Sequence, residues 1–164
     1  MRRTNYTVAL VGEGDGEWQL GVHVRDLYLP RHCGTAMTLK NARGFGGRHA
    51  LSLALELRAL GAHDAYGVVI DTDRLWDDQD RQVANKAGIV VIENDPSLEA
   101  TLLRIDGCTV ARTTAENKRI FADRFGGPAH RSGVIRRHFD REKIDSARSS
   151  VGPIDVLLRL LRCL

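Results

Sequence analysis

Two short apolar runs, each ending abruptly in carboxylates, limit most strongly what this chain can fold into. The first covers residues 8–11 and leads into Glu13, and the second covers residues 67–70 and leads into Asp71 and Asp73. Runs of this length, rich in β-branched residues, are typical of buried strands in a parallel sheet. Because ligands bind outside the carboxyl ends of such strands, we expect the three carboxylates to face one crevice.

Carboxylates gathered in one crevice repel one another unless a cation lies between them. Hard oxygen ligands, with few thiol or imidazole groups nearby in the sequence, suit Mg²⁺ or Mn²⁺ better than zinc. Asp71 and Asp73 leave their strand two residues apart and therefore project the same way. We expect these two and Glu13 to hold the metal, with Glu17 and Glu99 supporting a second ion or orienting water. A favourable charge at a helix N-terminus explains Glu17 and Glu99 equally well.

The rest of the chain alternates between strand and helix patterns. Strands are predicted over residues 6–11, 35–40, 65–70 and 89–92, and helices over about 16–31, 48–60, 77–87, 96–105, 113–125, 134–143 and from 153 onward. This order predicts an α/β fold whose sheet has about four mainly parallel strands flanked by helices. At 164 residues we expect one domain over 1–164, with a core of about 6–105 and a basic helical extension of about 112–164.

The net charge of +3 conceals an uneven distribution along the chain. Residues 1–111 carry 12 Lys and Arg against 15 Asp and Glu, whereas residues 112–148 carry 10 against 5. An acidic site followed by a basic segment suits a polyanion whose phosphate reaches a bound metal, and a solvated basic surface is an equal alternative. The candidate nucleic-acid contacts are Lys118, Arg119, Arg136 and Arg137, of which Lys118 is also a candidate catalytic residue.

Composition excludes several other classes of protein. With 43% hydrophobic and 27% charged residues, the chain is typical of a globular protein without a bilayer-spanning run. Its three cysteines are widely spaced, which disfavours a disulfide framework and a zinc knuckle. We therefore expect a cytoplasmic location and no membrane partner. The turn over residues 12–17 also stands where a dinucleotide-binding loop would lie, but its carboxylates would repel a cofactor phosphate.

Motif order gives the chain a resemblance to a known family. Toprim domains carry a glutamate after the first strand and a D-x-D motif after the third, as Glu13 and residues 71–73 (DTD) do here. Residues 13–17 (EGDGE) resemble the E-G-x-T-E motif of the RloB-like and OLD nucleases, with Gly16 in place of threonine. Residues 95–99 (DPSLE) resemble the N-P-x-F-E motif of RloB-like proteins, with Asp and Leu replacing Asn and Phe.

The resemblance implies a Toprim-like Rossmannoid fold and a function in prokaryotic defence. The resemblance to RloB-like proteins implies an Mg²⁺- or Mn²⁺-dependent nuclease that cleaves phosphodiester bonds of DNA or RNA. Such nucleases often act beside an ATPase partner in phage defence or restriction. Two alternatives stay open. The domain could bind nucleic acid or an ATPase partner without catalysis, or it could be a metal-dependent phosphatase or phosphotransfer domain. Assembly into a homo-oligomer also stays open.

Overall fold

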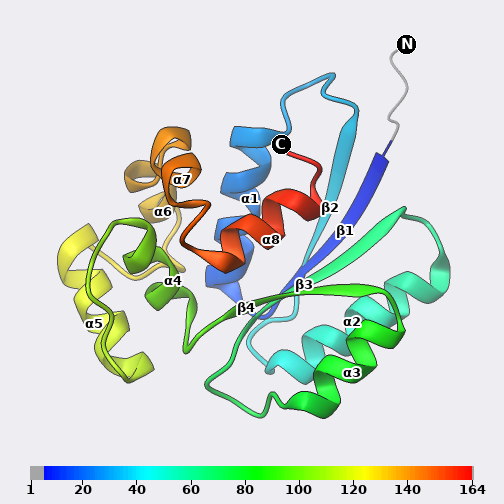
Figure 1. The fold of residues 1–164 in the computed structure, drawn as a ribbon, viewed down its shortest axis with the longest axis horizontal. Helices are drawn as coiled ribbons and strands as arrows, with labels where there is room; N and C mark the ends of the chain where they lie inside the picture. Colours follow the sequence, from blue (N-terminus) through cyan, green and yellow to red (C-terminus); the bar gives the residue numbers. More distant parts are fainter. Residues whose placement is uncertain (1–5, 164) are drawn as a thin grey trace.

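The computed structural model describes residues 6–163 and has a four-stranded parallel sheet at its centre (Figure 1). The strands are β1 (Tyr6–Gly12), β2 (Thr35–Asn41), β3 (Ala65–Asp71) and β4 (Ile89–Asn94), and their order in the sheet is β2-β1-β3-β4. All three strand pairs are parallel. The predicted α/β fold with a four-stranded sheet is therefore confirmed.

Helices cover both faces of this sheet (Figure 1). One face carries α2 (Gly47–Leu60) and α3 (Asp78–Lys86), and the other carries α1 (Asp15–Tyr28) and α8 (Gly152–Leu160). Successive residues of β1 point to opposite faces, so Val8 and Leu10 belong to one hydrophobic cluster and Ala9 and Val11 to the other. Burial on both faces explains why this strand reads as a continuous apolar run.

Four further helices extend the core beyond the α1 side of the sheet. They are α4 (Leu98–Ile105), α5 (Thr114–Phe125), α6 (Val134–His138) and α7 (Arg141–Ala147). Apolar residues of all four join the same hydrophobic cluster as α1 and α8, so the basic extension packs directly onto the core. Within residues 6–163, no helix is both long and apolar enough to cross a membrane.

The prediction of one helix over residues 134–143 is wrong. The chain leaves the helix at Phe139, whose side chain is 1% exposed and packs against the ring of Phe125 at a centroid distance of 5.1 Å. Asp140 then begins a new helix by accepting a hydrogen bond from the backbone N–H of Lys143 at 2.8 Å. Two other predicted limits also shift, because α1 ends at Tyr28 and α4 begins at Leu98, two residues after Pro96.

Strand order places the candidate site at the carboxyl ends of β1 and β3, the two inner strands of the sheet. From β1 the chain passes through α1 to β2 on one side, and it returns through α2 to β3 on the other side. The chain leaves the carboxyl end of β1 into α1 on one face and the carboxyl end of β3 into α3 on the other face. These connections separate at two neighbouring strands, which is where ligands bind in α/β sheets. The carboxylates after these two strands therefore lie at the expected position.

Candidate functional site

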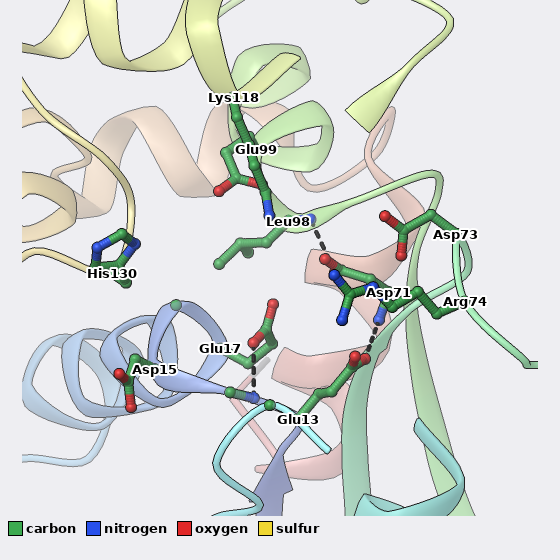
Figure 2. Close-up of a pocket in the computed structure, with 13 residues that line it drawn as sticks. Glu13, Asp15, Glu17, Asp71, Asp73, Arg74, Leu98, Glu99, Lys118 and His130 are labelled. Atoms are coloured by element: carbon green, nitrogen blue, oxygen red, sulfur yellow. Dashed lines mark hydrogen bonds between the residues drawn. The ribbon is translucent and has the colours of Figure 1, made fainter. Parts of the chain in front are cut away.

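A pocket of about 300 Å³ lies at the carboxyl ends of β1 and β3 (Figure 2). Its walls include the carboxylates of Glu13, Asp15, Glu17, Asp71, Asp73 and Glu99. All five predicted metal ligands are in this group, although they come from the loops after β1 and β3 and from the first turns of α1 and α4. The fold thus brings together side chains separated by up to 86 positions in the sequence.

Glu13 and Asp71 are held by a chain of backbone hydrogen bonds. The N–H of Asp71 donates to Oε2 of Glu13 at 2.8 Å, and the N–H of Leu98 donates to Oδ1 of Asp71 at 2.9 Å. The N–H of Glu13 donates to the carbonyl of Val69 at 2.9 Å. These bonds connect the loop after β1, the end of β3 and the start of α4, so the two carboxylates are fixed relative to each other.

Glu17 and Glu99 enter the pocket from two helices. Glu17 is 7% exposed, and its Oε2 accepts a hydrogen bond from the N–H of Gly14 at 2.9 Å. Glu99 is also 7% exposed and its carboxylate points into the pocket (Figure 2). Within the described residues, the Glu99 carboxylate takes part in no hydrogen bond and no ion pair. Among the described residues, the carboxylate oxygens of Glu99 do not belong to the fully buried atoms without a partner, so they are open to the pocket and accessible to a positive ligand.

Burial raises the pKa of three of these carboxyl groups. Removal from water raises the pKa of Glu17 to about 7, and repulsion from Glu13 and Glu99 adds to the shift. Burial raises the pKa of Asp71 to about 9, followed by repulsion from Glu17 and then Glu13. The pKa of Glu13 also rises, mainly through burial, although the hydrogen bond from the backbone of Asp71, and then the charges of Arg74 and Lys118, partly oppose the shift. A cation entering this pocket would therefore displace protons.

Two cations lie at the rim of the pocket. Lys118 reaches it from α5, and Arg74 lies directly after the DTD motif (Figure 2). Among residues 6–163 neither Arg74 nor Lys118 forms an ion pair. Both positive charges are therefore available to a bound anion.

The structure does not bring the other predicted nucleic-acid contacts to this pocket. Arg119 is not among the residues that line it and pairs with Asp123 at 3.2 Å. Arg136 and Arg137 are exposed on α6 but line none of its walls. Of the four predicted basic contacts, only Lys118 lies at the site.

Two pocket residues come from segments that sequence reasoning did not assign to the site. Gly44 lies in the loop before α2, and its N–H donates to the carbonyl of Glu13 at 2.7 Å. His130 lies in the loop before α6 and lines the pocket. The sequence around Gly44 (GFGG) does signal a special backbone, since Gly44 has a φ of 78°.

Comparison of the chain with protein-family models, curated proteins and solved structures finds no match.

The chemistry of the pocket fits a hard divalent cation. The donors around the pocket are carboxylates, with His130 as the one imidazole among its lining residues. Oxygen donors of this kind are the preferred ligands of Mg²⁺ and Mn²⁺, whereas zinc favours imidazole and thiolate. In residues 6–163 no three acidic, imidazole or thiol groups already converge closely enough to hold an ion. Mutual repulsion between the carboxylates opposes such convergence without a bound cation.

Proposed function

We propose that this chain is an Mg²⁺- or Mn²⁺-dependent nuclease that cleaves phosphodiester bonds of nucleic acid. The observation that carries the proposal is the Glu99 carboxylate, which belongs to a buried residue, opens into a pocket of other carboxylates and has no partner in the described residues. A cation is the ligand that would satisfy Glu99 and relieve the repulsion on Asp71 and Glu17 at once.

Each residue then has a role that follows from its position. Glu13, Asp71 and Asp73 would hold the metal, with Glu17 and Glu99 supporting a second ion or positioning water. A bound metal would lower the pKa of the water molecule it binds and would neutralise negative charge on the reacting phosphate. Lys118 and Arg74 would bind the non-bridging phosphate oxygens from the rim of the pocket.

The motif resemblance is the basis for proposing a family and a biological role as well. Membership of the Toprim group is supported by Glu13 and the DTD motif, which lie after the first and third strands of a parallel sheet. The DPSLE motif supports the RloB-like group, because Glu99 faces the other carboxylates. From this resemblance we propose a cytoplasmic role in phage defence or restriction, beside an ATPase partner.

Cleavage assays test the proposal directly. Purified protein is incubated with supercoiled plasmid, single-stranded DNA and tRNA, each with Mg²⁺, Mn²⁺ or EDTA. We expect cleavage of at least one substrate with a metal and none with EDTA. Asp73→Ala should abolish cleavage with little loss of binding. Asp78→Ala is the matched control, because Asp78 is an exposed carboxylate outside the pocket. Binding without cleavage under every condition would favour the non-catalytic alternative.

A further inference from the structure

Two exposed apolar side chains lie beside the carboxylate pocket. Among the described residues, the large hydrophobic side chains left exposed are Phe45 (74%), Leu60 (77%), Leu75 (80%) and Val83 (42%). Phe45 and Leu75 line one hollow of about 240 Å³, which shares Gly44 and Arg74 with the carboxylate pocket. Leu60 and Val83 lie on α2 and α3, outside both. The two apolar side chains at the hollow therefore lie beside the proposed metal ligands.

The loop that carries Phe45 is anchored through the glycines on either side of this residue. Gly44 is tied to the loop after β1 by the hydrogen bond to Glu13, and both Gly44 and Gly46 have positive φ values. Gly47 packs so closely on Trp76 that an added Cβ would lie 3.0 Å from its ring. Trp76 in turn donates from Nε1 to Glu93 at 2.7 Å. Phe45 is thus presented to solvent on an anchored loop.

Positive charge accompanies the apolar surface. Arg74 borders both the hollow and the carboxylate pocket and forms no ion pair within the described chain, whereas Arg48 is engaged by Asp77 and Asp80 at 3.0 Å each. The guanidinium of Arg74, which is unpaired among residues 6–163 and borders both the hollow with Phe45 and the carboxylate pocket, suits a ligand that has both a flat apolar face and a phosphate.

The opposite side of the carboxylate pocket has a similar character. A second hollow there shares Asp15 and His130 with the pocket and is also lined by Trp18 and Arg43. Trp18 is half-buried, and its indole N–H donates to no group in the described residues. An aromatic side chain and an arginine therefore lie on each side of the carboxylates.

We propose that the pocket takes single-stranded nucleic acid, with a base stacked on Phe45 beside Leu75 and the neighbouring phosphate held by Arg74. Base faces are accessible in an unpaired strand, whereas a duplex conceals them and presents phosphates and groove edges. An exposed ring flanked by a free cation fits the first of these substrates. This inference rests on the proposed function, because it assumes that the strand delivers a phosphate to the carboxylates.

Binding assays with matched variants test the inference. Fluorescence anisotropy is measured with labelled 15-nucleotide single strands of DNA and of RNA, and with the corresponding duplexes, in Ca²⁺ as an oxygen-preferring cation. We expect tighter binding of single strands than of duplexes. Phe45→Ala should weaken single-strand binding by about tenfold and leave duplex binding unchanged. Phe45→Trp should retain binding, and Leu60→Ala, which removes an equally exposed apolar side chain elsewhere, should have no effect.

An abasic probe separates stacking from general apolar contact. Strands with one abasic nucleotide at successive positions should show one position where the wild type loses about tenfold in affinity and Phe45→Ala loses nothing further. Preference for duplexes, equal losses in Phe45→Ala and Leu60→Ala, or no such position would overturn the inference. DNA and RNA arms identify which strand is preferred.

The proposed function fails separately from this inference. Phe45-dependent binding of single strands without metal-dependent cleavage would contradict the nuclease and uphold the binding surface. Metal-dependent cleavage with unchanged single-strand binding in Phe45→Ala would uphold the nuclease and contradict the binding surface.

Discussion

At the scale of single residues, the pocket holds the buried Glu17 and the half-buried Asp71 close to other carboxylates, and their ionisation is opposed by both removal from water and repulsion. Their pKa values are raised in the folded state, so the folded protein binds more protons than the unfolded chain between about pH 5 and 9. Stability of the metal-free protein should therefore fall as pH rises through this range. Carboxyl groups with lowered pKa values, such as Asp106, contribute fully above pH 5 and do not reverse this trend.

Urea unfolding in EDTA at several pH values measures this dependence. The free energy of unfolding should decrease by up to about 1.4 kcal/mol per pH unit for each carboxyl group that is protonated only in the folded state, first for both Glu17 and Asp71 and above about pH 7 for Asp71 alone. Glu17→Gln should flatten the dependence, because the amide cannot ionise. Saturating Mn²⁺ should also flatten it by stabilising the ionised pocket. Stability that is constant or rises over this pH range in EDTA would contradict the assigned pKa directions.

Lys118 and Arg119 are adjacent in sequence but differ in position. Lys118 lines the pocket without an ion pair in residues 6–163, whereas Arg119 is paired with Asp123 on the outside of α5. Lys118→Ala should lower the cleavage rate by about tenfold or more and reduce the salt dependence of binding, because one phosphate contact is lost. Arg119→Ala should change both quantities less. Equal effects of the two substitutions would indicate a diffuse basic surface instead.

At the scale of elements, the turn from β1 into α1 fixes the spacing of Glu13 and Glu17. Gly12 leaves little space there, since an added Cβ would lie 3.0 Å from the backbone nitrogen of Trp18. Gly12→Ala should therefore displace the start of α1, lower the free energy of unfolding by about 1–3 kcal/mol and weaken metal binding. Gly152→Ala meets no atom within 4 Å and is the control, measured by the same urea unfolding and Mn²⁺ titration. Similar losses in both variants would contradict this role of Gly12.

Elements with a strong local pattern could be predicted from the sequence, and elements decided by tertiary packing could not. The run over residues 8–11 is apolar because β1 is buried on both faces, so its pattern alone identifies a strand. Residues 134–143 have helical spacing throughout, but burial of Phe139 against α5 and the cap formed by Asp140 divide them into two helices. The apolar spacing does not reveal this competition between helix continuation and packing.

At the scale of the whole molecule, topology explains which parts of the site the sequence could predict. Glu13, Asp71 and Asp73 end neighbouring parallel strands, so strand order alone brings them together. Gly44 and His130 reach the pocket from loops whose paths depend on packing, and the sequence gives no direct sign of their position.

The basic extension has less positive charge available for a ligand than its composition indicates. Arg124 and Lys143 both bind the buried carboxylate of Asp106, and Arg148 pairs with Asp155 at 2.8 Å. Part of the positive charge therefore stabilises the fold and is not free to bind a polyanion. Net charge along a segment cannot separate these two uses.

Titration of Mn²⁺ into the metal-free protein by calorimetry tests the central claim most directly. The wild type should bind Mn²⁺ saturably and release protons, because the carboxyl groups of Glu17 and Asp71 ionise on binding. Asp71→Asn and Glu99→Gln should bind at least tenfold more weakly, and Asp78→Asn, outside the pocket, should bind as the wild type does. Absence of binding in the wild type, or equal binding in all four proteins, would contradict a metal site at these carboxylates.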